Sequence, residues 1–571
     1  MQLVIDIESN ALMELTIDSK GNPAKECTKV HCVVTKDIAT NVVHVWHGND
    51  LGKPLLDYLG KATMLIGHNL YGFDLECLRR MLGYRGNAKI YDSLVVSKLM
   101  YPDLQNHPLG GNSLSDWGKY MGNEKIDYKG TWDELTIEMV DYCVQDVHVA
   151  HDIYVKQKDW LGKNPLYQKV LQLEHMASDI VNQQQVNGFN FDAGAAEKLL
   201  HELLQFKAQV EDEMRVIFPD KVHIRFSEKT GKRLKDKIEV FNPASRKQIA
   251  ERLFEKYGWE APETENGNPN VDASVLGDLD FPEAKKLVEY FDVIKLMGQV
   301  EDWWTRATNS RDRKVHGYVN VQGAATGRCT HSQPNLAQVS GDHRARALWI
   351  PHDGHVLLGS DLSGLELRML AHYMHEYDGG AYADVILNGD IHVHNQQKAG
   401  LPTRNNAKTF IYGFLYGAGD AKVGKIVNGS SKQGAALKDK FLKELPALAK
   451  VKQWVEFQAA KKNSVTLVDG REAPVRSKHA ALNTLLQGSG AVVSKYWMIM
   501  ADRNLTTRFG KNKVKQLAYV HDELQFSCPP DIADEAGRII TESAIEAGTR
   551  LGIKMPVNAE YKIGRNWSET H

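Results

Sequence analysis

The chain has 571 residues, which is too long for one hydrophobic core, so it is expected to divide into several domains. It contains 70 basic and 72 acidic residues. The near balance of charge excludes a uniformly cationic nucleic-acid coat and restricts any such binding to local patches. The six cysteines include no Cys-x-x-Cys pair, which indicates neither a disulfide framework nor a zinc site and favours the reducing cytoplasm. No apolar run is long enough to span a bilayer, so no membrane association is expected.

Residues 1–155 are predicted to form an α/β domain. A strand is expected over 3–7 and a long helix over 136–160. Apolar residues recur at helical spacing in that helix and predict a buried stripe. The stripe consists of Met139, Cys143, Val147, Ala150 and Tyr154.

Residues 165–300 are predicted to be mainly helical, with an interruption at 221–241 that has the features of a loop or hairpin. Strands are expected again from about 311. A helix-rich stretch follows over 376–479, and strands resume near 514. Six basic residues make the interruption cationic: Arg225, Lys229, Lys232, Arg233, Lys235 and Lys237.

The first candidate site is a group of four acids. Asp6 and Glu8 lie two apart in the predicted strand, so their side chains share one face. Asp146 follows Tyr142 by one helical turn, which directs both side chains into one site, and Asp74 is the fourth acid. Clustered carboxylates repel unless a hard cation joins them, and Mg²⁺ or Mn²⁺ prefers such oxygen ligands. Two ions could activate a water for phosphodiester hydrolysis; for any one acid the alternative is a solvated surface residue.

The second candidate site is a pair of aspartates. Asp361 is predicted at the end of an apolar strand, and Asp522 at the tip of a hairpin formed by 519–526. Two aspartates presented from strand ends could hold two metal ions over a nucleotide and a primer hydroxyl. The alternative for the hairpin tip is an ordinary polar turn. Ser363 and Glu366 also have the spacing of a capping box, in which Glu366 would only bond a backbone N–H at a helix start.

The segment 404–416 is predicted to be a helix with functional residues along one side. Arg404, Lys408, Tyr412 and Tyr416 fall four apart and form a slowly drifting stripe. A guanidinium and an ammonium one turn apart can hold a polyphosphate, and a ring one turn further can stack on a base or sugar. The pattern indicates a nucleoside triphosphate grip; the alternative is an exposed basic helix edge with buried tyrosines.

The four acids and the tyrosine of the N-terminal domain resemble the proofreading 3′→5′ exonuclease domain of DNA polymerases. The resemblance covers about the first 150 residues. It implies that the four acids bind two metal ions and that Tyr142 holds the attacking water.

The segments 361–368, 404–416 and 519–526 resemble the three polymerase motifs of family A DNA polymerases. Two further stretches, 326–328 and 334–338, look like the primer-contacting segment of that family. The thumb motif has a counterpart at 242–248, and residues within 408–420 and 479–487 are most similar to the replicative polymerases of short-tailed phages.

The resemblance implies a multidomain fold of α/β and α+β parts. A ribonuclease-H-like exonuclease domain would occupy 1–155, and a right-hand polymerase domain would occupy 156–571. No 5′-nuclease domain is expected before Asp6. The expected subdomains are a thumb at about 165–310, a palm at about 311–375 and 480–571, and fingers at about 376–479.

On the same resemblance, Arg404 and Lys408 would bind the triphosphate. Tyr412 would stack near the incoming sugar and base, and Tyr416 would support the templating position. Glu366 would lie under the sugar, facing Tyr412, and would crowd a 2′-hydroxyl. A tyrosine rather than a phenylalanine at position 412 is associated in the family with acceptance of 3′-deoxy terminators.

Arg328, Asn483 and Gln487 would reach the minor groove of the nascent base pair, where every correct pair presents acceptors at similar places. The alternative for the two amides is an ordinary helix surface. His521 is a further expected DNA contact. The resemblance implies two Mg²⁺ ions at each acidic site, with Mn²⁺ as a substitute.

The expected ligands are primer-template DNA, dNTPs and a single-stranded 3′ end in the exonuclease site. The expected partners are replisome proteins such as a helicase-primase and a single-strand-binding protein, in the cytoplasm of an infected bacterial host. In thioredoxin-dependent phage relatives a long thumb insertion recruits the clamp protein. Here only 221–241 occupies that place, so thioredoxin dependence is not expected, and this segment is either a DNA-backbone contact or a solvated loop.

Three other functions are alternatives. A single-subunit RNA polymerase shares the palm chemistry, an inactive DNA-binding protein could serve assembly, and a nuclease could carry a vestigial polymerase half. Glu366 beside Tyr412, together with an N-terminal nuclease pattern, favours DNA over RNA synthesis. The complete set of six acids argues against the inactive forms.

Overall fold

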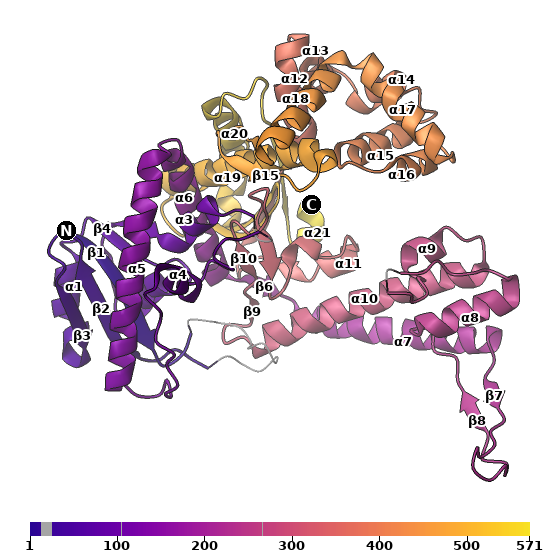
Figure 1. The fold of residues 1–571 in the computed structure, drawn as a ribbon, viewed down its shortest axis with the longest axis horizontal. Coiled ribbons are helices and arrows are strands. Elements are labelled where there is room, and N and C mark those ends of the chain that lie inside the picture. The colour runs from indigo at the N-terminus through magenta and orange to yellow at the C-terminus, as the bar shows by residue number, and fades with distance from the viewer. Residues whose placement is uncertain (13–24, 104–105, 265) are drawn as a thin grey trace. The chain divides into compact units, whose positions relative to one another are not determined.

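A computed structural model describes residues 1–12, 25–103, 106–264 and 266–571. The chain forms two compact units, drawn as ribbons in Figure 1. Unit 1 comprises Met1–Phe189, His316–Gln338 and Pro351–His571. Unit 2 comprises Asn190–Val315 and Val339–Ile350.

Unit 1 begins with a mixed five-stranded sheet of order β3-β2-β1-β4-β5. β2 is antiparallel to β1 and β3, whereas β4 runs parallel to both β1 and β5. Every residue of β2 is buried, as expected for an inner strand covered on both faces. The strands are β1 (Gln2–Ser9), β2 (Val30–Asp37), β3 (Val43–His47), β4 (Met64–Gly67) and β5 (Lys89–Asp92).

Helix α5 (Ile137–Lys163) packs across this sheet on β1, β2 and β4. Thr136 caps it, since its side chain accepts a hydrogen bond from the backbone N–H of Met139. The predicted apolar stripe is buried along its length, which confirms the expected helix. The other helices of this part are α1 (Lys53–Leu59), α2 (Asp74–Glu76), α3 (Ser93–Met100) and α4 (Leu114–Met121).

The C-terminal part of unit 1 contains an antiparallel four-stranded sheet of order β16-β17-β13-β18. Helix α6 (Tyr167–Asn187) follows α5 in the chain and packs on β16 and α19. The sheet strands are β13 (Val356–Leu362), β16 (Lys515–Val520), β17 (Glu523–Cys528) and β18 (Ala559–Gly564), and the helices around them are α12 (Leu365–Asp378), α19 (Ala481–Phe509), α20 (Ala533–Arg550) and α21 (Trp567–Thr570).

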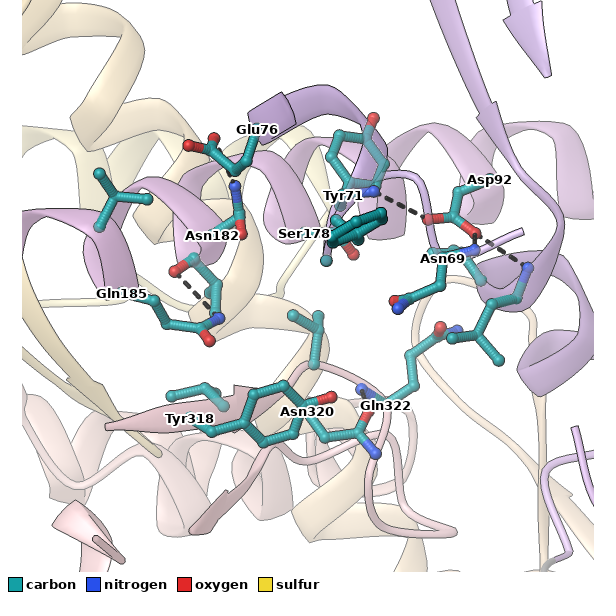
Figure 2. A pocket seen from close by; sticks show the side chains of 18 of the residues that line it. Asn69, Tyr71, Glu76, Asp92, Ser178, Asn182, Gln185, Tyr318, Asn320 and Gln322 are labelled. Atoms are coloured by element: carbon teal, nitrogen blue, oxygen red, sulfur yellow. Dashed lines mark hydrogen bonds between the residues drawn. The ribbon is translucent and has the colours of Figure 1, made fainter. Parts of the chain in front are cut away.

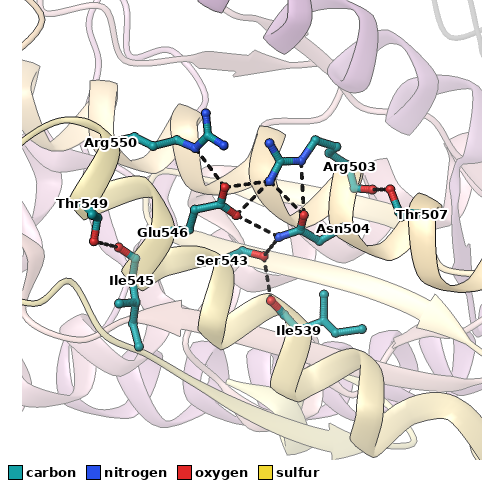
Figure 3. A network of polar contacts seen from close by, with 9 residues as sticks. All are labelled: Arg503, Asn504, Thr507, Ile539, Ser543, Ile545, Glu546, Thr549 and Arg550. Carbon is teal, nitrogen blue, oxygen red and sulfur yellow. Dashed lines mark hydrogen bonds and ion pairs between the residues drawn. The ribbon is translucent and has the colours of Figure 1, made fainter.

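Helices α19 and α20 are joined by a polar network as well as by apolar packing (Figure 3). Both carboxylate oxygens of Glu546 accept hydrogen bonds from Arg503, at 2.7 and 2.9 Å, and one accepts from Arg550 at 2.8 Å. Burial alone would raise the pKa of Glu546, but hydrogen bonds from Arg503, Asn504 and Arg550 lower it to about 2. The carboxylate therefore stays charged and holds the two helices together.

Six helices between 381 and 462 lie in the stretch that the sequence predicts to be helix-rich, 376–479, and they pack into the same core as the C-terminal sheet. The helices are α13 (Ala381–Asn388), α14 (Ile391–Ala399), α15 (Arg404–Leu415), α16 (Asp420–Lys425), α17 (Ser431–Glu444) and α18 (Pro446–Lys462). The small strands of unit 1 are β10 (Tyr318–Asn320), β11 (Thr330–Ser332), β14 (Ser464–Thr466) and β15 (Glu472–Pro474).

Unit 2 is built on two long helices, α7 (Ala193–Ile217) and α10 (Pro282–Asn309), which pack against each other. Its core contains Val210, Leu253 and Tyr290. The basic interruption at 221–241 forms a two-stranded hairpin, in which Val222 pairs with Ile238. The remaining elements are β6 (Phe189–Phe191), β7 (Lys221–His223), β8 (Lys237–Glu239), α8 (Arg246–Tyr257), α9 (Ala273–Gly277), β9 (Lys314–Val315), α11 (His343–Arg346) and β12 (Trp349–Ile350).

No helix within the described ranges has both the length and the apolar character needed to cross a membrane.

Candidate active sites

The four N-terminal acids lie on three elements of the first sheet domain. Asp6 and Glu8 lie on β1, Asp74 is the first residue of α2, and Asp146 lies on α5. Asp6, Glu8 and Cys143 each offer one ligand atom within 4.8 Å of the others. We name the four carboxylates the N-terminal acidic cluster.

Burial and neighbouring carboxylates raise the pKa values of these acids, as expected where like charges lie close together. Burial, then the charge of Asp146, raises the pKa of Asp6 to about 7. Burial, followed by Asp6 and Asp146, raises the pKa of Glu8 to about 10. Burial and Asp6 also raise the pKa of Asp74 well above its ordinary value. The charged forms of these carboxylates are therefore disfavoured unless a cation lies among them.

The residues of the cluster fit divalent cations. The side chains of Asp74 and Asp146 are buried, and one oxygen of each, Oδ1, has no hydrogen-bond partner. A buried acceptor without a partner is unfavourable. Carboxylate oxygens are the ligands that Mg²⁺ and Mn²⁺ prefer.

Lys125 is a member of this site that the sequence did not reveal. Its Nζ lies 2.5 Å from Asp146 Oδ2 and 4.4 Å from the centroid of the Tyr142 ring. The sequence also indicated Cys143 only as a core residue, whereas its thiol donates a hydrogen bond to Asp6 Oδ2 at 3.3 Å. Lys125 belongs to the loop between α4 and α5, and no periodic pattern links a loop residue to a helix face.

Two hollows of unit 1 adjoin each other beside this cluster. One, of about 790 Å³, is lined by Glu8 and Tyr142 among others. The other, of about 320 Å³, is drawn in Figure 2 and is rich in amide and tyrosine side chains. Leu12 and Phe73 line both hollows, so the two are neighbours. The labelled side chains around the second are Asn69, Tyr71, Glu76, Asp92, Ser178, Asn182, Gln185, Tyr318, Asn320 and Gln322.

The second acidic site lies at the ends of neighbouring strands, as the sequence predicts. Asp361 lies near the end of β13, and Asp522 lies in the turn between β16 and β17. His521 occupies the first position of that turn with φ of 59°, the left-handed conformation that few side chains adopt. Although part of Asp361 is exposed, desolvation of its carboxyl group, followed by Asp522 and Glu523, raises its pKa to about 7.

Glu523, next to Asp522, is held by residues from the end of the chain. Its Oε1 accepts from Trp567 Nε1 at 2.5 Å and from Gln525 Nε2 at 2.8 Å, and its Oε2 lies 3.0 Å from Nδ1 of His571. Burial alone would raise the pKa of Glu523, but these partners lower it. Glu523 is thus a charged anchor for the turn that carries Asp522, and two of its partners, Trp567 and His571, are too distant in sequence to be anticipated.

Glu366 does not cap its helix, so the capping-box interpretation is wrong. The N-cap of α12 is Gly364, with φ of 59° and no side-chain cap. Glu366 Oε1 instead accepts from Arg328 Nη2 at 3.1 Å, and Oε2 accepts from the Tyr416 hydroxyl at 2.6 Å. The hydrogen-bonded tyrosine is therefore Tyr416. For Tyr412, expected to face Glu366, burial raises the pKa most, and the charges of Glu366 and Asp522 raise it further.

Helix α15 presents the predicted stripe. Arg404 and Lys408 are exposed, and Arg404 Nε donates to Asp390 Oδ2 at 2.7 Å. The rings of Tyr412 and Tyr416 lie 6.3 Å apart. The alternative of buried tyrosines is wrong for Tyr416, which is 47% exposed.

Asn483 and Gln487 lie on α19 and are half-buried between fully buried neighbours. The Oδ1 of Asn483 is buried without a partner. Gly488 shows how closely α19 approaches the segment before Arg328, since a Cβ at that glycine would lie 3.1 Å from the Thr326 carbonyl oxygen. The structure thus brings this part of α19 close to the segment that precedes Arg328.

Comparisons with known proteins connect this chain to DNA synthesis. The family described as DNA polymerase family A matches residues 220–569. The DNA-directed DNA polymerases of Enterobacteria phage T3 and Escherichia phage T7 are each 32% identical over 720 aligned residues, covering all of this chain and all of each relative. The DNA polymerase I of Aquifex aeolicus is 25% identical over 93% of this chain and 92% of its own length.

Among solved structures, the POL domain of Pol1 from M. smegmatis, in complex with DNA primer-template and dNTP, has a similar fold. Its TM-score is 0.80 at 18% sequence identity, and the match covers 100% of this chain and 96% of that one.

Proposed function

Because this chain belongs to DNA polymerase family A, we propose that it extends primer 3′ ends along a DNA template and removes wrong nucleotides with a second, 3′→5′ exonuclease site. The observation that carries the synthetic activity is the pairing of Asp361 with Asp522, close enough that Asp522 raises the pKa of Asp361. Burial raises the pKa of Asp522, the charge of Arg328 lowers it and that of Glu366 raises it, so these two hydrogen-bonded side chains lie near the pair.

At the synthetic site, Asp361 and Asp522 would hold divalent cations, with Mg²⁺ preferred by oxygen ligands. When bound, such ions acidify the primer hydroxyl and stabilise the pyrophosphate leaving group. Arg404 and Lys408 would bind the triphosphate, for which Arg404 would release Asp390. The stripe on α15 thereby orients the incoming dNTP.

Selection of the nucleotide would use side chains on both sides of the pocket. Tyr412 would contact the sugar and base, and Tyr416 the templating position. Glu366 would crowd a 2′-hydroxyl. Minor-groove contacts to the new base pair would come from Arg328, Asn483, Gln487 and His521.

At the second site, the N-terminal acidic cluster would hold two divalent cations, and Tyr142 would orient the attacking water. The strand order β3-β2-β1-β4-β5, with two acids on β1, supports a ribonuclease-H-like exonuclease domain over 1–155. The hollow lined by Glu8, Phe73, Trp132 and Tyr142 would take the single-stranded 3′ end, since aromatic rings stack on unpaired bases.

The remaining division would follow the right-hand plan. Unit 2 covers most of the proposed thumb at 165–310, although α6 clusters with unit 1. The palm would comprise 311–375 and 480–571, and the fingers 376–479. We place the activity in replication of a phage genome within an infected bacterium, alongside helicase-primase and single-strand-binding proteins.

One labelled primer-template with Mg²⁺, incubated with and without dNTPs, tests both sites. Asp522→Ala should stop extension and preserve degradation, and Asp6→Ala should do the reverse. Asp57→Ala, an exposed acid on α1, is the matched control and should retain both activities. Loss of both activities in each site variant would refute the two-site assignment.

A further inference from the structure

A lysine side chain lies beside the N-terminal acidic cluster and contacts one of its carboxylates and Tyr142. Lys125 Nζ is 2.5 Å from Asp146 Oδ2 and 4.4 Å from the Tyr142 ring centroid. Its side chain is 26% exposed, and that of Asp146 is 4% exposed. Although burial alone would lower the pKa of Lys125, Asp146 raises it above its ordinary value, so the ammonium is charged at every physiological pH.

The backbone around Lys125 is held on both sides. Gln145, on α5, donates from Nε2 to Asn123 Oδ1 at 2.7 Å and to the Glu124 carbonyl at 3.0 Å. On α4, a Cβ at Gly118 would lie 2.7 Å from the Asn123 carbonyl oxygen and 3.3 Å from the backbone nitrogen of Lys125. Only glycine at 118 permits this close approach, so the loop presents Lys125 in a fixed position.

The two carboxylate oxygens of Asp146 differ in their hydrogen bonding. Oδ2 accepts the hydrogen bond from Lys125, whereas Oδ1 is buried without a partner and remains for a cation. Tyr142 lies one turn before Asp146 on the same helix, so one ammonium reaches both side chains. An ammonium can only donate. The phenol oxygen therefore accepts from Lys125, while a hydrogen bond from Tyr142 to Asp146 links the three side chains.

We propose that Lys125 is a positioning residue of the exonuclease reaction, which holds Tyr142 and Asp146 in the arrangement that the attacking water requires. This inference rests on the proposed exonuclease function. In that reaction the water oxygen bonds to the terminal phosphodiester phosphorus, the P–O3′ bond breaks, the departing O3′ takes up a proton, and a nucleoside monophosphate leaves.

A purely structural ion pair would give different results from a positioning residue. Loss of Lys125 removes a positive charge beside the cation ligands, so binding of a divalent cation should not weaken. Loss of an outer partner that orients a reacting group lowers activity by about 10- to 100-fold. If Lys125 acts through Tyr142, removing both should lower turnover no further than the more severe single change does.

The test uses the full chain and a labelled single-stranded DNA, with kcat and KM measured for Lys125→Ala, Lys125→Arg, Tyr142→Phe and the double variant Lys125→Ala/Tyr142→Phe. Mn²⁺ binding is followed by electron paramagnetic resonance, and primer extension reports on folding. Lys129→Ala is the matched control, because Lys129 and its partner Asp127 are each 83% exposed.

We expect Lys125→Ala to lower kcat by about 10- to 100-fold, with extension and Mn²⁺ binding retained. Lys125→Arg should recover part of kcat, since a guanidinium keeps the charge and can donate to both partners. Full kcat in Lys125→Ala, weakened Mn²⁺ binding, or losses that multiply in the double variant would each overturn the inference. A wild-type chain that leaves the DNA intact would instead overturn the exonuclease assignment, and the inference with it.

Discussion

Replacing Glu174 with glutamine should destabilise unit 1 strongly. Glu174, on α6, is fully buried, and its Oε1 accepts from Arg471 Nη1 at 2.5 Å and from Lys495 Nζ at 2.9 Å. Its Oε2 accepts from Lys495 at 2.7 Å. Arg471 also pairs with Asp469 at 2.7 Å. The four charges balance, and they join α6, α19 and the turn between β14 and β15.

The magnitude follows from what the substitution leaves behind. Arg471 keeps Asp469, but Lys495, whose side chain is 1% exposed, loses its ion pair with Glu174. Removing one partner of a buried pair costs about 3–5 kcal/mol, because a charge remains buried without compensation. Glu174→Gln/Lys495→Met removes that charge and should recover part of the loss, with a coupling of about 0.5–3 kcal/mol.

Urea-induced unfolding followed by circular dichroism measures the effect. The matched control is Lys462→Met, which breaks an ion pair to Glu472 whose members are 46% and 38% exposed, and which should cost less than about 1 kcal/mol. Burial alone would raise the pKa of Glu174, but Lys495 and Arg471 lower it below 4.5. The stabilisation is therefore complete above pH 4.5 and is lost as pH falls through the folded-state pKa. A Glu174→Gln midpoint equal to that of Lys462→Met would refute the reasoning.

Three further predictions concern function. Because the pKa of Asp361 is about 7 without metal, protons compete with Mg²⁺ for this carboxylate below pH 7. The Mg²⁺ concentration for half-maximal extension should therefore rise by about tenfold per pH unit below 7. A Mg²⁺ requirement that does not change with pH would contradict this. Tyr412→Phe should retain synthesis but disfavour dideoxynucleotides by at least roughly fivefold, the value of one lost hydrogen bond of about 1 kcal/mol; unchanged terminator use in a competition assay would count against the placement of Tyr412. Since 221–241 forms only a hairpin, added thioredoxin should not lengthen products under single-encounter conditions, and a large lengthening would reverse that expectation.

Local patterns allowed much of both acidic sites to be predicted. The two-residue spacing of Asp6 and Glu8 and the four-residue spacing of Tyr142 and Asp146 depend only on strand and helix geometry. The same holds for the stripe on α15. These predictions hold in the folded protein because the geometry within one strand or helix fixes which of its residues share a face.

Short motifs alone did not determine which partners their side chains bond. Ser363 and Glu366 fit a capping box by spacing, yet Gly364 begins the helix and Glu366 bonds Arg328 and Tyr416. A carboxylate forms a stronger hydrogen bond with a charged donor than with a neutral one. Glu366 therefore bonds the guanidinium of Arg328, 38 residues away, and not a neighbouring backbone N–H.

By itself, the sequence determined which residue types share a strand face or a helix side, and hence the two acidic sites and the stripe on α15. Only the tertiary structure decided which distant groups complete them. Glu174 meets Lys495 across 321 positions, Glu523 meets His571 across 48, and Lys125 reaches Asp146 from a loop. The physical reason is that these contacts arise from the packing of separate elements, where burial makes each charge require a partner that no periodicity in the chain specifies.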